Sequence, residues 1–158
     1  MNQKNKILAC VFGILYLILI IYFIKKSFEN GETSTESSEA VANIIKNVLN
    51  KLFNANIEMT DNYLCIIRKL VGHFGFNVVL GVVSALFYIN LCLDKKITLL
   101  LHYIIGFVVA FSSEFLCEAF TSGRSASFYD VLIDYSGFIL ISTILFIIFF
   151  VKKDKEIA

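Results

Sequence analysis

The sequence predicts an all-α integral membrane protein: a bundle of four transmembrane helices with an amphipathic helix in the first extracytoplasmic loop. Of its 158 residues, 58% are hydrophobic and only 17% are charged, whereas soluble domains are about 45–50% apolar and about 25% charged. Four apolar runs each approach the ~20 residues that a helix needs to cross a hydrocarbon core. The length allows one membrane domain over residues 1–158, and the net charge of +1 without a basic stripe argues against a nucleic-acid partner.

The first span is predicted at residues 7–24, between Lys4 and Lys6 on one side and Lys25 and Lys26 on the other. Its apolar stretch is longer than the ~7–15 residues of a signal-peptide core, and no small-residue cleavage site follows it. We therefore expect a retained membrane anchor.

The long loop after this span contains a predicted amphipathic helix at about residues 39–53. The preceding residues 27–39, SFENGETSTESSE, are expected to form a solvated turn region. The helix is too short to span, so we expect it to pack on the bundle or lie at the bilayer surface, with a dimer contact as the alternative. Its apolar residues recur at three- and four-residue spacing: Val41, Ile44, Ile45, Val48, Leu49 and Leu52.

The remaining spans are predicted at residues 70–93, 97–120 and 129–151. The chain has no proline, so no proline kink interrupts them. Lys and Arg divide evenly between the two membrane faces, but one face concentrates them in three short segments, which predicts that both termini are cytoplasmic. Small residues expected to permit close helix contacts are Gly72, Gly75, Gly81 and Gly106.

Ionisable residues in these spans are the main functional signal, because a charge at the bilayer centre costs ~2.5–3.5 kcal/mol even on lenient scales. The predicted topology brings three helix ends to the extracytoplasmic face. We expect His73 and Asp134 to face inward there. The candidate ligand-binding residues are Arg68, Lys69, His73, Asn77, Glu114, Glu118, Arg124, Asp130 and Asp134.

Three interpretations of these charges stay open. In the first, they only cross-link helix ends, in a structural or partner-binding membrane protein. In the second, they form a shallow polar pocket for a lipid headgroup or another amphiphile. In the third, an enzyme uses His73 as general acid or base, oriented by a carboxylate. No nucleophile elbow, zinc-type His/Cys spacing or Gly-rich phosphate loop is present, so no catalytic residue, metal or cofactor is predicted.

The segments IIRKLVGHFGFNVVLG (66–81) and FTSGRSASFYDVLIDYSG (120–137) resemble the VanZ-like family of small bacterial membrane proteins. That family carries Arg-Lys and His-Phe before the second helix, Phe-x-Pro-Gly-Arg in the last loop, and Asp and Gly on the last helix. Here Ser122 replaces the usual Pro, and Glu118 stands where Gln is usual. The counterparts in this chain are Arg68, Lys69, His73, Phe74, Phe120, Gly123, Arg124, Asp130, Asp134 and Gly137.

The resemblance implies residence in a bacterial plasma membrane and a contribution to resistance against glycopeptide or lipoglycopeptide antibiotics such as teicoplanin. Teicoplanin carries a lipid tail, so binding or shielding at the outer leaflet fits that role. The expected partner is a membrane lipid or an amphiphilic ligand, either a lipoglycopeptide or an envelope lipid headgroup.

The other polar residues are expected to have no ligand role. His102 is predicted to lie at the membrane–water interface. The four cysteines contain no CxxC pair and are expected to be apolar helix residues, although the topology would allow Cys65 and Cys117 to form a bridge. The cysteines are Cys10, Cys65, Cys92 and Cys117.

Overall fold

The structure is a computed structural model that describes residues 2–117, 120–121, 123 and 125–157. It confirms the all-α class. Within this part of the chain, four helices are long and apolar enough to cross a membrane: Gln3–Ser27, Asp61–Asn90, Lys95–Phe115 and Phe128–Lys152. The protein is therefore, by helix length and hydropathy, a multi-pass helical membrane protein.

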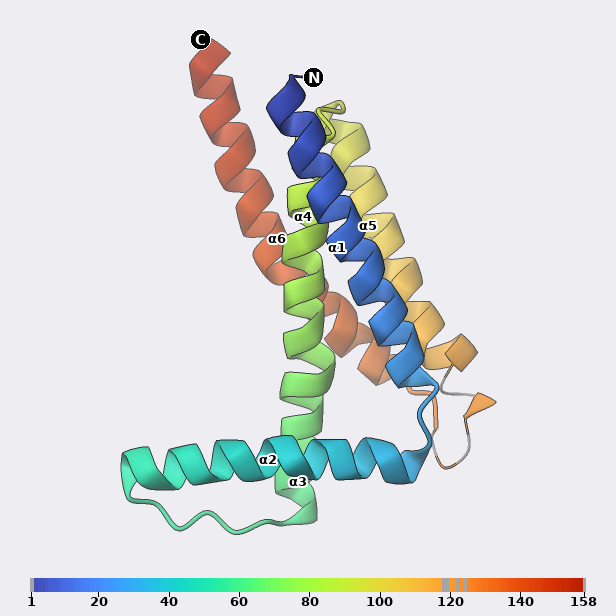
Figure 1. The fold of residues 1–158 in the computed structure, drawn as a ribbon, viewed down its shortest axis with the longest axis vertical. Coiled ribbons are helices and arrows are strands. Elements are labelled where there is room, and N and C mark those ends of the chain that lie inside the picture. Colours follow the sequence, from blue (N-terminus) through green and yellow to red (C-terminus); the bar gives the residue numbers. More distant parts are fainter. Residues whose placement is uncertain (1, 118–119, 122, 124, 158) are drawn as a thin grey trace.

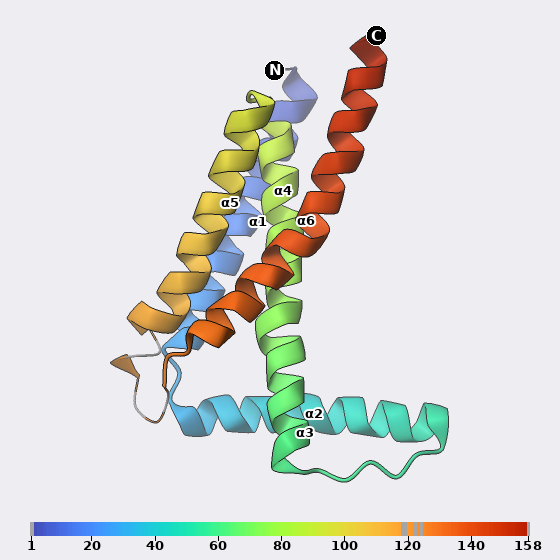
Figure 2. The same ribbon diagram turned by 180° about the vertical axis from the view of Figure 1, so that it is seen from behind.

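The helices form a bundle, and one further helix lies across one end of it (Figure 1). Helices α1 (Gln3–Ser27), α4 (Phe76–Asn90), α5 (Lys95–Ser112) and α6 (Phe128–Ile157) run along the bundle. The start of α1 and the end of α6 lie at the same end, and both views show α2 (Gly31–Phe53) lying across the opposite end (Figures 1 and 2).

The second and third spans are not uniform α-helices. The second begins as α3 (Asp61–Ile67), continues through the π-helical turn η1 (Arg68–Gly75) and ends as α4. The third span, α5, ends in a second π-helical turn, η2 (Ser113–Cys117). Such wide turns occur mostly in short pieces and frequently at functional sites.

The prediction of a solvated turn region up to residue 39 was wrong, because α2 begins at Gly31. The Asn30 side chain caps this start by accepting a hydrogen bond from the Thr33 N–H at 2.9 Å. The hydroxyls of Thr35 and Ser38 donate to the carbonyls of Gly31 and Ser34 at 2.8 Å. These two hydroxyls therefore donate within the helix, as back-bonded hydroxyls can.

Helix α2 leaves the predicted apolar stripe largely uncovered within the chain. Val41, Ile44, Val48 and Leu52 are exposed, while Ala42 is fully buried against the rest of the protein. An amphipathic helix with an uncovered apolar face, placed across the end of a membrane bundle, is typical of a helix at the bilayer surface.

Phe138 on α6 is the centre of the bundle. It is fully buried and packs with Leu80, Tyr16, Phe23 and Val109 in the main apolar cluster. A second cluster toward the termini consists of Ala85, Tyr88, Phe146 and Phe150.

The prediction that His102 is interfacial was wrong. Its side chain is fully buried, stacks on Phe138 with ring centroids 4.5 Å apart, and lies 3.0 Å from the hydroxyls of both Ser84 and Ser142. Two hydroxyls on neighbouring helices satisfy both ring nitrogens, so burial leaves no orphaned polar atom.

Cys65, also raised as a possible bridge residue, is a free thiol.

Small residues determine how closely α6 approaches the other spans. A Cβ at Gly81 would overlap the backbone carbonyl of Phe138, and one at Gly137 would overlap the carbonyl of Phe74. Gly72, by contrast, has open space around it. The close contact of α6 with both α4 and η1 therefore depends on Gly81 and Gly137.

We predict that Gly81→Ala destabilises the protein by ~1–3 kcal/mol, because the added methyl group forces two helix backbones apart. The matched control is Gly72→Ala, which meets no atom within 4 Å and should leave stability nearly unchanged. Equilibrium unfolding in detergent micelles measures both. Equal stabilities of the two variants would contradict the close packing at Gly81.

Candidate functional site

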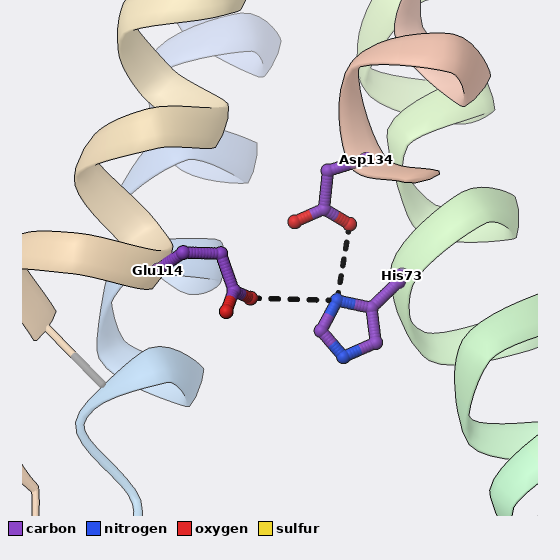
Figure 3. Close-up of side chains that lie close together, drawn as sticks. All are labelled: His73, Glu114 and Asp134. Atoms are coloured by element: carbon purple, nitrogen blue, oxygen red, sulfur yellow. Dashed lines mark hydrogen bonds and ion pairs between the residues drawn. The ribbon is translucent and has the colours of Figure 1, made fainter. Parts of the chain in front are cut away.

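The candidate site lies where both π-helical turns meet α6. His73 belongs to η1, Glu114 to η2 and Asp134 to α6, and their side chains converge from three separate elements (Figure 3). Because these elements are distant in sequence, the convergence is produced only by the packing of the spans.

One ring nitrogen of His73 lies between two carboxylates. Its Nδ1 is 3.1 Å from Asp134 Oδ1 and 3.6 Å from Glu114 Oε1. The side-chain exposures are 10% for His73, 1% for Glu114 and 0% for Asp134. Charges removed from water to this degree are stable only when they are paired and hydrogen-bonded, so these contacts hold the three elements in register.

Asn77 completes this group, which we call the central cluster (His73, Asn77, Glu114 and Asp134). Its side-chain amide donates to Asp134 Oδ1 and to the backbone carbonyl of His73, both at 2.9 Å. Asp134 Oδ2 is buried and has no hydrogen-bond partner among the described residues. Asp134 thus uses one carboxylate oxygen for the helix contacts and keeps the other available.

A second polar contact joins η1 to α6 one turn away. Lys69 Nζ lies 3.0 Å from Asp130 Oδ1 and 4.7 Å from the centre of the Tyr129 ring. Lys69 precedes His73 by four residues, as Asp130 precedes Asp134, so the same two elements make both contacts. Because this pair is partly solvated, it adds little stability.

A cavity of about 270 Å³ opens beside the central cluster. We call it the α1–α2 cavity. Tyr22 and Phe23 of α1 and Phe76 of α4 form apolar parts of its wall, and His73 and Glu114 border it. Arg68 also lines it and forms no ion pair with any carboxylate among the residues that the structure describes.

A second cavity has a volume of about 330 Å³. It is bordered by Lys69 and Asp130, and by Arg68 and His73, which line both cavities. The two cavities therefore share one guanidinium and one imidazole, and Ser38 also lines both.

Most of the predicted site residues lie in or beside this region. His73, Asn77, Glu114 and Asp134 form the central cluster, and the expected inward orientation of His73 and Asp134 is confirmed. Lys69 and Asp130 pair beside it, and Arg68 lines both cavities. Glu118 and Arg124 fall outside the described residues. Whether any of these residues binds a ligand stays a prediction.

Sequence reasoning missed the contribution of α1 and α2. Besides Tyr22 and Phe23, the cavity wall includes Ser34, Ser37 and Ser38 of α2. Their spacing of three and four residues places them on one helix face. Had the segment been predicted as helical, this spacing would have indicated a polar face.

Comparisons of the chain with protein-family models, curated proteins and solved structures gave no match. The resemblance to the VanZ-like family therefore rests on the motifs of the sequence.

We predict that Asn77→Ala lowers stability by about 1.5–3 kcal/mol, because a buried carboxylate loses a hydrogen-bond donor. Asn90→Ala is the matched control, since the Asn90 amide also donates to the carbonyl four residues back, that of Leu86 at 2.7 Å, but forms no hydrogen bond with a carboxylate among the described residues. Unfolding in micelles compares the two variants. A cost for Asn77→Ala no larger than that for Asn90→Ala would show that the contact to Asp134 contributes nothing.

Proposed function

We propose that this protein is a VanZ-like membrane protein that binds the polar part of an amphiphile in the α1–α2 cavity. The ligand is a lipid-tailed glycopeptide such as teicoplanin or an anionic envelope lipid, and binding or shielding it at the outer leaflet contributes to resistance. The supporting observation is a cavity that combines an apolar wall with Arg68.

The chemistry of the wall suits such a ligand. An arginine guanidinium binds carboxylate or phosphate through two parallel hydrogen bonds. Tyr22, Phe23 and Phe76 offer apolar surface for the beginning of an acyl chain, and the serines of α2 offer hydroxyls to sugar or peptide groups. All of these groups border one space, so one ligand can contact them together.

The size of the cavity limits what enters it. Drug-sized ligands occupy pockets of ~300–1,000 Å³, so about 270 Å³ accommodates a headgroup, a single sugar or a short length of acyl chain. A glycopeptide would therefore engage through one part while its bulk stays outside.

The proposed localisation is the bacterial plasma membrane, with both termini cytoplasmic and the α2 end outside. In support, the start of α1 and the end of α6 lie at the same end of the bundle, away from α2 (Figure 1), and the Lys and Arg distribution favours cytoplasmic termini. This orientation gives the cavity access to the outer leaflet.

One observation favours a second candidate, an enzyme acting on a lipid-linked envelope substrate. Asp134 holds His73 at Nδ1, an arrangement that orients an imidazole for proton transfer through its other nitrogen. Because His73 borders both cavities, a substrate has access to this ring.

We predict that Arg68→Gln weakens amphiphile binding at least ~10-fold, because charge-assisted hydrogen bonds to the anionic group are lost. Lys51→Gln, which removes an exposed cation on α2, is the control and should bind like the wild type. Teicoplanin and an anionic phospholipid are each titrated into protein in zwitterionic nanodiscs, which separates the two ligand sources. Unchanged binding of both ligands by Arg68→Gln would refute the binding proposal.

The enzyme alternative is separated from binding by His73→Ala. If catalysis is the function, resistance in cells disappears while ligand retention in nanodiscs stays normal. If binding is the function, Arg68→Gln loses resistance and ligand retention together. Full resistance in both variants would leave the charges with a structural role only.

For the orientation, we predict that Ser125→Cys, in a background without native cysteines, is labelled in intact cells by a membrane-impermeant thiol reagent. Ser125 is exposed in the loop before α6. The control is Lys96→Cys, exposed at the start of α5 at the end of the bundle that holds the termini, which should react only after lysis. The reverse labelling pattern would invert the proposed topology.

A further inference from the structure

We infer that His73, Glu114 and Asp134 form a binding site for a divalent first-row transition-metal ion. Each residue offers one ligand atom, and these atoms all lie within 4.8 Å of one another. All three residues are buried, and each comes from a different element. The site is thus a preformed group of donors on packed spans.

The distances suit a common ion. Nitrogen and oxygen ligand atoms lie ~2.0–2.2 Å from a zinc ion, so two ligand atoms at a tetrahedral angle around the ion are ~3.3 Å from each other. The Nδ1 atom of His73 is 3.1 Å from Asp134 Oδ1 and 3.6 Å from Glu114 Oε1. These two distances lie on either side of the tetrahedral value, and all donor atoms lie within 4.8 Å of one another, so rotation of the two carboxylates can bring the three donors to one ion.

Asp134 provides a second observation that points to a ligand. The Asp134 side chain is fully buried, yet its Oδ2 has no hydrogen-bond partner among the described residues. In Figure 3 this oxygen turns away from His73, toward the side of Glu114. Oδ1 faces His73 Nδ1 and also accepts from Asn77, and Oδ2 is a second acceptor without a partner, so this oriented carboxylate offers an ion either oxygen.

The donor types determine the class of ion. Mg²⁺ and Ca²⁺ favour sites made of oxygen alone, whereas an imidazole nitrogen with carboxylates suits Zn²⁺, Mn²⁺, Fe²⁺ and Co²⁺. The two carboxylates supply two negative charges, which offset a dication where uncompensated charge is costly.

A fourth coordination position would face the α1–α2 cavity, because His73 and Glu114 both line it. Three protein ligands with one open position are typical of zinc sites that bind an exchangeable group. A water molecule, or a phosphate or carboxylate oxygen of a ligand in the cavity, would complete the coordination. The ion needs no amphiphile to bind, so this inference goes beyond the proposed function and is tested separately.

The test is a Zn²⁺ titration of the full chain, purified in detergent with a tag that lacks histidine and stripped with a chelator. All four cysteines are changed to serine so that no thiolate contributes. Calorimetry gives the stoichiometry, and the visible absorption of Co²⁺ reports the coordination geometry. We expect one equivalent of Zn²⁺ per chain, with the affinity reduced by more than ~10–100-fold in His73→Gln, Glu114→Gln and Asp134→Asn, since loss of an outer-shell partner alone costs that much.

Two matched controls come from the chain itself. His102→Gln changes the only other histidine, which contacts serine hydroxyls, and Asp94→Asn changes a helix-capping carboxylate at the far end of the bundle while keeping the cap. Both should bind like the cysteine-free parent.

The inference is overturned if the parent binds no Zn²⁺, or if His73→Gln and Asp134→Asn bind as tightly as the parent. It is also overturned if the controls lose binding to the same degree. Elution as a single folded species in size exclusion is required of every variant. If His73→Gln fails this check, the isosteric Glu114→Gln and Asp134→Asn decide the result.

Discussion

The structure depends on a single imidazole nitrogen held between two buried carboxylates. His73 Nδ1, Asp134 and Glu114 come from three different elements within membrane-spanning segments. Each polar group would be costly to bury alone at that depth, so each span requires the other two in place. The close contact at Gly137, whose missing side chain admits the carbonyl of Phe74, brings α6 near enough for this arrangement.

The irregular backbone serves the same arrangement. His73 and Glu114 both lie on π-helical turns, which widen a helix and change the direction in which later side chains point. A wide turn also weakens regular hydrogen bonding, so it persists only where other contacts stabilise it. The hydrogen bonds of Asn77 to the His73 carbonyl and to Asp134 are such contacts, because they join α4 to both η1 and α6.

The α1–α2 cavity favours a binding role for the buried charges over a purely structural one. Charges that only cross-link helices have no need of an open space beside them, yet His73, Glu114 and Arg68 all line this cavity. Much of its remaining wall comes from α1 and α2, so the crossing helix contributes directly to the cavity. His73 and Glu114 both contribute to the contacts between the spans, belong to the proposed ion site and line the cavity proposed for an amphiphile.

The sequence by itself determined the four spans, because length and apolar content decide whether a helix can cross a bilayer. It also determined that His73 and Asp134 face inward, since exposure of either to lipid is costly. Only the tertiary structure decided that His102 is buried between two serines, that α1 and α2 enclose a cavity, and that Glu114 meets His73. These features arise from contacts between helices distant in the chain, and neither periodicity nor hydropathy specifies which faces of two helices will meet.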